Sequence, residues 1–316
     1  MNLKNSIKII LKPDSKNNYI TTTAIGEKYF DDFSKFSMPS WLVYCEKFGI
    51  GLAVVVENLI DVNDKYYKKA NWQKFLVGKE LQIIDSSVNN ICHLDTDIII
   101  SPLAPNIFEF HNESKISITS LRQNLPFSYD TTLRKIAFFR NKFYDQKYPL
   151  DSVLFISLED LYKYHNFKVP KEADESCSGM YVYNAKKYSD FFEKIFYTYS
   201  SDVDTLTNGG DQAHFNYYVL NNEVKYLPYK FQAMWVFEQA ARYPFLYDSP
   251  SQELIRKCIE SALLDNYFLH FAGSWHESSM WKNDEILNND SSILMQDFDL
   301  YLSKKVLGTP VGVIKP

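Results

Sequence analysis

The sequence is poor in glycine. Only 10 of its 316 residues are glycine, about 3% against an average usage near 7%. Neither of the two common glycine-rich phosphate loops, G-x-G-x-x-G and G-x-x-x-x-G-K-[ST], occurs in the chain. These absences argue against a Rossmann dinucleotide site and a P-loop nucleotidase, and they exclude collagen-like and Gly/Ser-rich disordered chains.

The sequence also lacks paired cysteine motifs, long apolar runs and an excess of basic residues. The four cysteines show no C-x-x-C spacing, which is typical of free thiols in a reducing compartment, and we expect a cytoplasmic location. No apolar run reaches the roughly 18 residues of a membrane span, and the first residues lack the layout of a signal peptide. The net charge of −5 gives no excess of Lys and Arg, so nucleic acid is not an expected partner.

The composition that remains is that of a globular protein. Hydrophobic residues make up 46% of the chain and charged residues 23%. Residues 19–24, 52–56 and 90–94 are apolar or β-branched and predict strands, while residues 37–48 and 66–84 between them predict helices. Strands that alternate with helices predict right-handed βαβ units around a parallel sheet, so the expected fold class is α/β.

Further elements are predicted along the rest of the chain. Strands are expected at residues 180–183 and 267–271, and helices at residues 102–110, 131–144, 186–200, 211–220 and 252–264. No interdomain linker is evident. We therefore expect one domain over residues 14–281 and a C-terminal extension, residues 282–316, that packs on its outside.

Two aspartates follow the predicted strand 90–94. Asp95 and Asp97 stand two residues apart, where the strand ends, and ligands of parallel sheets bind at the carboxyl ends of strands. Paired carboxylates in such a place suit Mg²⁺ or Mn²⁺, which share them with substrate phosphates. The alternative is a solvated turn after the strand, because Asp is common in turns.

Three other segments carry candidate functional residues. His270 ends the predicted strand 267–271 just before Gly273, and imidazole binds Mn²⁺ well beside carboxylates; the alternative is a hydrogen-bonded histidine at a strand edge. Asp211 and Gln212 begin a predicted helix, where they would contact substrate hydroxyls or, for Asp211, only cap the helix. Small residues at 176–179 would admit a sugar ring or simply form a tight turn.

Taken in order, these segments resemble a GT-A-fold glycosyltransferase, in particular the retaining glycosyltransferase family eight, which includes the glycogenins and bacterial lipopolysaccharide galactosyltransferases. Residues 94–97, Leu-Asp-Thr-Asp, match the L-D-x-D motif of that family. Ser178-Gly179-Met180 is similar to its sugar-facing turn, Asp211-Gln212 to its D-Q pair, and His270 with Gly273 to its metal-binding end. The resemblance spans residues 19–276, about four-fifths of the chain.

The resemblance implies a fold and an activity. The fold would be a GT-A-type single domain with a mixed, mainly parallel central sheet flanked by helices. The protein would use Mn²⁺ or Mg²⁺ to move a sugar from a nucleotide-diphosphate sugar to an acceptor hydroxyl with retention. A UDP-sugar is favoured over a GDP-sugar, and the acceptor would be a glycan, a lipid-linked sugar or a protein.

The resemblance also implies a role for each matching residue. The metal ligands would be Asp95, Asp97 and His270, and the catalytic pair would be Asp211 and Gln212. The donor-binding residues would be Thr22, Ala24, Tyr29, Lys74, Asp95, Ser178, Gly179, Gly273 and His276, with Tyr29 on the base.

The chain departs from the family pattern at three places. Gly26 replaces an acidic residue, Cys177 replaces an asparagine, and His276 replaces the leaving-group lysine. These departures motivate a first alternative, a non-catalytic sugar- or nucleotide-binding protein on a GT-A-like fold. A second alternative is a HAD-type phosphohydrolase, whose D-x-D-x-[TV] motif is close to residues 95–99.

Overall fold

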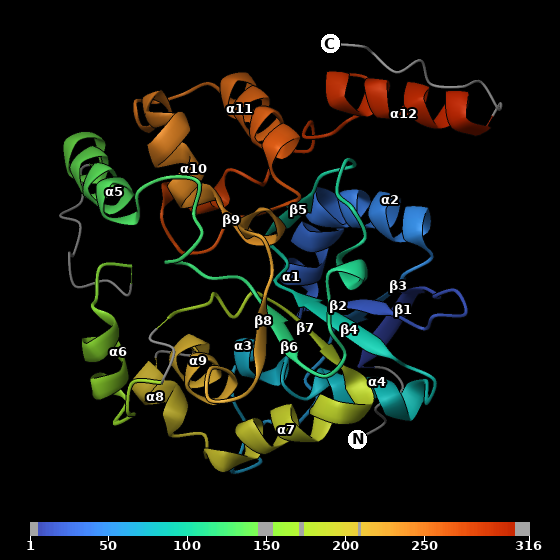
Figure 1. Cartoon of the computed structure of the whole chain (residues 1–316), viewed down its shortest axis with the longest axis vertical. Coiled ribbons are helices and arrows are strands. Elements are labelled where there is room, and N and C mark those ends of the chain that lie inside the picture. Colours follow the sequence, from blue (N-terminus) through green and yellow to red (C-terminus); the bar gives the residue numbers. More distant parts are fainter. Residues whose placement is uncertain (1–5, 145–153, 171–173, 208–209, 307–316) are drawn as a thin grey trace.

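The computed structural model describes residues 6–144, 154–170, 174–207 and 210–306, and its centre is a mixed sheet of seven strands (Figure 1). In spatial order the strands are β1 (Ile7–Leu11), β3 (Gly51–Val55), β2 (Tyr19–Thr23), β4 (Asn90–Leu94), β7 (Met180–Asn184), β6 (Ile116–Ile118) and β8 (Val224–Tyr226). Helices flank this sheet, so the predicted α/β class is confirmed.

The strands of the sheet pair in both directions. β2 lies between β3 and β4 and is parallel to both, as the βαβ pattern predicts. β6 and β8 are also parallel. β1 pairs antiparallel with β3, and β7 pairs antiparallel with β4 and with β6. Parallel and antiparallel pairs are therefore equally frequent, and β1 lies before the predicted domain start at residue 14.

Each face of the sheet carries its own hydrophobic core, because successive side chains of a strand point to opposite faces. One face packs against α3 (Ala70–Gln73), α4 (Val77–Ile84), α7 (Ala185–Thr198) and α9 (Gln212–Val219). The other face packs against α2 (Met38–Phe48). Strand β3 is buried along its whole length, as its unbroken apolar run predicts.

A second, three-stranded sheet adjoins the first. Its strands lie in the order β5 (Ile98–Ile100), β10 (Phe268–His270) and β9 (Ala233–Met234). β5 follows β4 after only three residues, so the chain passes from one sheet to the other through residues 95–97. β10 pairs antiparallel with β5 and parallel with β9. Asp95 and Asp97, the two candidate metal ligands, therefore lie at the junction of the two sheets.

Two predicted helices are wrong. Residues 66–84 form two short helices, α3 and α4, instead of one, because residues 74–76 make a turn between them. Residues 66–69 precede α3, and there Tyr66 N donates to Asp64 Oδ1 at 2.8 Å. Residues 102–110 form turns and a 3₁₀ helix at Ile107–Glu109. Pro105 lacks the N–H that a continuous helix would need there.

The prediction for the helix over residues 37–48 is confirmed in its end and corrected in its start. Gly49 ends α2 with φ of 65°, the left-handed conformation that glycine adopts without a steric penalty. The Ser37 hydroxyl does not cap the helix. It donates instead to Thr96 O at 2.6 Å, which ties the start of α2 to the segment between the two aspartates.

The remaining helices surround this frame (Figure 1). They are α1 (Glu27–Asp32), α5 (Tyr129–Phe143), α6 (Leu158–Tyr164), α8 (Val203–Thr207), α10 (Trp235–Arg242), α11 (Gln252–Asp265) and α12 (Ile293–Val306). α12 belongs to the C-terminal extension and buries Leu294, Met295 and Phe298. In the part of the chain that the structure describes, no helix is both long enough and apolar enough to cross a bilayer.

Candidate functional site

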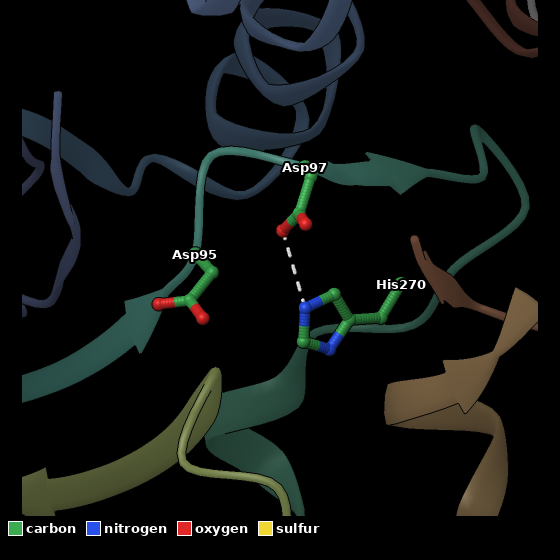
Figure 2. Close-up of side chains that lie close together, drawn as sticks. All are labelled: Asp95, Asp97 and His270. Carbon is green, nitrogen blue, oxygen red and sulfur yellow. Dashed lines mark ion pairs between the residues drawn. The ribbon is translucent and has the colours of Figure 1, made fainter. Parts of the chain in front are cut away.

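Strand pairing brings His270 to the two aspartates. The antiparallel register of β10 on β5 sets His270 opposite Ile98, and Phe271 N donates to Asp97 O at 3.0 Å. One potential ligand atom from each of Asp95, Asp97 and His270 lies within 4.8 Å of the others (Figure 2). Residues that are far apart in the chain therefore form one compact cluster of two carboxylates and an imidazole.

The same kind of register places Gly179 against this cluster. β7 runs antiparallel to β4, so Met180 lies opposite Leu94, and Asp95 N donates to Gly179 O at 2.8 Å. A Cβ at Gly179 would lie 2.7 Å from Asp95 Oδ2 and 3.0 Å from His270 Nε2. The first separation is shorter than real Cβ contacts and the second is tighter than nearly all of them, so only glycine fits here without displacing the cluster.

The charges of the cluster interact closely. His270 Nε2 lies 3.1 Å from Asp97 Oδ1, the contact drawn in Figure 2. Burial alone would raise the pKa of Asp97, but the His270 ring and the Lys74 charge outweigh burial and lower it. The side chains of Asp95 and Asp97 are 36% and 25% exposed, whereas the Oδ1 atom of Asp97 is itself buried.

Lys74 joins the cluster to the start of α9. Its Nζ lies 3.0 Å from Asp211 Oδ2 and 3.6 Å from Asp95 Oδ1, and it donates to Ser178 O at 2.9 Å. Burial lowers the pKa of Lys74, but the two carboxylates outweigh it and raise the pKa to about 12. The side chain is therefore a fixed cation between two carboxylates.

Gln212 and Asn216 support the segment that precedes Gly179. Gln212 Nε2 donates to Glu175 Oε1 at 2.6 Å, and Arg122 forms an ion pair with the same glutamate at 2.9 Å. The Asn216 amide accepts from Ser176 N at 2.7 Å and donates to Ser176 O at 2.8 Å. These bonds fix the backbone that carries Ser178 and Gly179.

Two histidines near the site occupy different environments. His93 is buried in β4, with Nε2 3.8 Å from Asp95 Oδ1 and Nδ1 3.2 Å from Thr21 Oγ1. Burial, with the Lys74 charge, lowers the pKa of His93 to about 3, so its ring is neutral. His276 is exposed, and its ring packs against Tyr144 with the centroids 4.5 Å apart.

The other predicted donor-binding residues lie outside this contact network. Thr22 and Ala24 are fully buried, and Ala24 N donates to Val55 O at 2.8 Å. Tyr29, on α1, is 65% exposed. Gly273 has φ of 111° and open space where a Cβ would stand. The proposed roles of these four residues stay predictions.

A groove lies elsewhere on the molecule. It measures about 930 Å³ and lies between α2, β5 and residues 283–299 of the C-terminal extension. None of the predicted site residues lines it. Its walls mix apolar side chains such as Phe36 and Phe298 with charged ones such as Lys35 and Glu46.

Sequence reasoning assigned no role to two residues that contact the His270 ring or to a third that supports one of them. Gln232 and Cys177 contact the far side of the His270 ring, and Thr119 bonds to Gln232. Cys177 was noted only as a departure from a family pattern. Gln232 and Thr119 carry no sequence signal, because only the packing of β9 beside β10 and of β6 beside β7 brings them to the site.

Comparison with known proteins gives structural matches only. No family model matches the chain, and no curated protein matches it. Three similar solved structures are a glycosyltransferase involved in glycosylation of the major capsid of PBCV-1, the apo form of the bifunctional glycosyltransferase WbbM, and the glycosyltransferase GlyE of Streptococcus pneumoniae TIGR4.

The three structures are remote from this chain. For the capsid-related enzyme the identity is 9% and the TM-score 0.46, with 85% of this chain and 98% of that chain covered. For WbbM the values are 11% and 0.46, with 84% and 46% covered. For GlyE they are 13% and 0.44, with 93% and 64% covered.

Proposed function

We propose that the protein is a metal-dependent glycosyltransferase that moves a sugar from a nucleoside-diphosphate sugar to an acceptor hydroxyl, with retention. The observation that supports it is the meeting of Asp95, Asp97 and His270 at the junction of the two sheets. Two carboxylates and one imidazole are ligands that suit Mn²⁺ or Mg²⁺. Gly179, with no Cβ, leaves the space beside them free, so the residues present fit a divalent ion.

The chain's own residues would divide the work as follows. Asp95, Asp97 and His270 would hold the ion, whose Lewis acidity stabilises negative charge on a departing diphosphate. Lys74 is buried and already fixed by Asp211 and Asp95, so its charge needs no reorientation to favour an anion nearby.

Asp211 and Gln212 would orient the donor sugar. In the transfer the C1–O bond to the diphosphate breaks, and the nucleoside diphosphate leaves with the electron pair. The acceptor oxygen forms the new bond to C1, and its proton passes to the diphosphate. The Lys74 ion pair positions Asp211, and Glu175 positions Gln212 at 2.6 Å. Groups held in place before reaction lower the entropy cost of reaching the transition state.

The nucleotide base would lie toward the end of β2. The exposed ring of Tyr29 offers a face on which a base can stack, and Thr22 and Ala24 precede it in the chain. A UDP-sugar is the first donor to test and a GDP-sugar the second. The acceptor would be a glycan, a lipid-linked sugar or a protein, and His276 would add positive charge when protonated.

Thermal unfolding with a panel of nucleotides and nucleotide-sugars, with and without Mn²⁺, tests the proposal. A donor should raise the melting temperature by an amount that grows with its concentration, and only when Mn²⁺ is present. Stabilisation by a nucleotide without Mn²⁺ and without turnover would favour a binding protein. Release of phosphate from a phosphomonoester with no nucleotide-sugar would favour a phosphohydrolase.

Replacement of one metal ligand gives a sharper test. Asp97→Ala should lower sugar transfer at least 100-fold and remove the Mn²⁺ dependence of thermal stabilisation, because the ion loses a carboxylate. The fold should persist in circular dichroism. Asp190→Ala, which removes an exposed carboxylate of α7, is the matched control and should keep full activity. Full activity of Asp97→Ala would rule out the metal assignment.

A further inference from the structure

One tryptophan differs from the others in its environment. All five tryptophans lie in the described part of the chain, and Trp275 alone is not buried. The four that are at most 6% exposed are Trp41, Trp72, Trp235 and Trp281. Trp275 follows the candidate metal ligand His270 by five residues, which span at most about 18 Å. The tryptophan that the fold leaves partly exposed therefore lies near the candidate site.

Trp275 forms a small aromatic surface with Tyr144 and His276. The rings of Tyr144 and Trp275 are nearly parallel, with 7° between their planes and 6.5 Å between their centroids. The His276 ring packs on Tyr144 with the centroids 4.5 Å apart. Tyr144 and Trp275 are partly buried and His276 is exposed. The end of α5 and the start of the 3₁₀ helix His276–Ser279 thus present their rings together.

A buried ion pair holds the aromatic surface in place. Glu277, which is 1% exposed, accepts a hydrogen bond from Arg140 Nε at 2.6 Å and another from the Tyr144 hydroxyl at 3.1 Å. Burying two opposite charges adds little stability over well-packed apolar side chains, because both charges lose their hydration. The pair does join α5 to the segment that carries Trp275, and both elements also pack on α10. The rings are therefore positioned before any ligand binds, which lowers the cost of binding.

The chemistry of this surface suits a sugar ring. The face of an aromatic ring carries partial negative charge, and one face of a hexose carries C–H groups with partial positive charge, so the two faces attract when stacked. The proposed function already places the donor sugar at Asp211 and Gln212 and the base at Tyr29. A further ring that stacks beside Trp275 would therefore belong to the acceptor.

We propose that the aromatic surface binds a sugar ring of the acceptor, so that the acceptor is a glycan. Trp275 and Tyr144 contact the sugar, and Arg140 and Glu277 are positioning residues that fix the two rings. This inference rests on the proposed function, because it assigns the second substrate of the same reaction. It also gives the buried Arg140–Glu277 pair a role that stability alone does not explain.

Tryptophan fluorescence tests the binding without any assay of transfer. The probes are the methyl glycosides of glucose, galactose, mannose and N-acetylglucosamine. At least one of them should change the emission of the wild-type protein, because a stacked sugar removes water from a partly exposed indole. The change should be absent from Trp275→Phe, which lacks this indole. No change with any glycoside, or a change with uridine alone, would overturn the inference.

Steady-state kinetics of sugar transfer gives the second measurement, with the glycoside that binds best as acceptor. Trp275→Ala should raise the acceptor KM about tenfold more than the donor KM, the scale of a lost ring contact. Trp275→Phe should recover most of this loss, since it keeps an aromatic face. Phe245→Ala, which truncates a 52% exposed aromatic side chain of the 3₁₀ helix Pro244–Tyr247, is the matched control and should leave both KM values unchanged. Equal increases of the two KM values in a folded Trp275→Ala protein would contradict the assignment.

The two measurements separate this inference from the proposed function. If a glycoside binds at Trp275 but no nucleotide-sugar supports transfer, the proposed function fails, and the acceptor assignment fails with it. If transfer occurs but Trp275→Ala behaves like Phe245→Ala, the acceptor assignment alone fails.

Discussion

Two lysines six positions apart are both fully enclosed by the fold, yet their environments differ. Lys74 lies between Asp211 and Asp95, which raise its pKa to about 12 against the effect of burial. Lys68 donates to two backbone carbonyls at 2.8 Å, and its ammonium lies 3.8 Å from the centroid of the Phe196 ring.

Burial dominates at Lys68. It lowers the pKa of the ammonium to about 8, and the charges of Asp204 and Asp64 raise it by less. Carbonyls and an aromatic ring satisfy the donors of an ammonium without cancelling its charge, whereas carboxylates do both. The comparison shows that contacting carboxylates keep Lys74 charged far above neutral pH, whereas Lys68, without them, loses its charge near pH 8.

The largest effect is expected from Lys74→Met. Asp211 would remain buried without its cation, which should lower the free energy of unfolding by about 3–5 kcal/mol in urea denaturation. Under the proposed function, sugar transfer should also fall at least 100-fold. The control is Lys79→Met, since Lys79 pairs with Asp190 on the surface and should cost no more than about 1 kcal/mol. Equal losses in the two variants would contradict the special place of Lys74.

Asp211→Asn should lower the pKa of Lys74 toward that of Lys68. With its nearest carboxylate neutralised, the pKa of Lys74 should fall well below about 12 as burial gains weight. NMR of the lysine ε-methylene signals as a function of pH measures this. Asp190→Asn should leave Lys74 unchanged. A pKa that stays near 12 in Asp211→Asn would mean that Asp95 alone holds the charge.

A smaller effect is expected from Lys68→Met. The side chain keeps its packing on Phe196 and loses a charge that is costly to bury, while the carbonyls of Tyr66 and Tyr199 lose a donor. These opposing changes should leave the free energy of unfolding at pH 7 within about 1 kcal/mol of the wild type. Mn²⁺ affinity should not change. A loss as large as that of Lys74→Met would show that the two lysines are equivalent.

The smallest effect is a pH dependence that belongs to Lys68. Its pKa is about 8 in the fold and near 10.5 in the unfolded chain, so between these values the unfolded chain binds more protons. The stability of the wild type relative to Lys68→Met should therefore rise with pH through this window, by about 1 kcal/mol between pH 8 and pH 9. Denaturation of both proteins at both pH values measures this difference, and a difference that does not change with pH would contradict the prediction.

Long, locally consistent patterns were predictable from the sequence. The apolar strands β2, β3, β4 and β7 and the helices α5, α7 and α11 agree with the predictions to within a few residues. The short strands β5, β6, β8 and β9 were not separately predictable, because two or three residues carry too little periodicity to distinguish a strand from a loop. The break between α3 and α4 was missed for a different reason: turns and tertiary contacts override helix propensity there.

The residues of the candidate site also fall into two groups, those that the sequence selected and those that only the structure revealed. Asp95, Asp97, His270 and Lys74 were each selected from the sequence, and the structure brings them together. Their metal binding and catalytic roles stay predictions. The contacts of Gln232 could not be predicted, because no pattern in the neighbouring sequence indicates that this side chain lies beside His270.

The sequence by itself determined most of the long strands and helices, and it placed two carboxylates at the end of a buried strand. Only the tertiary structure decided which buried polar groups meet. The register of β10 on β5 sets His270 against Asp97, and the register of β7 on β4 sets Gly179 against Asp95. The physical reason is range: helix and strand formation depends on neighbouring residues, whereas these contacts depend on pairing between segments that are far apart in the chain.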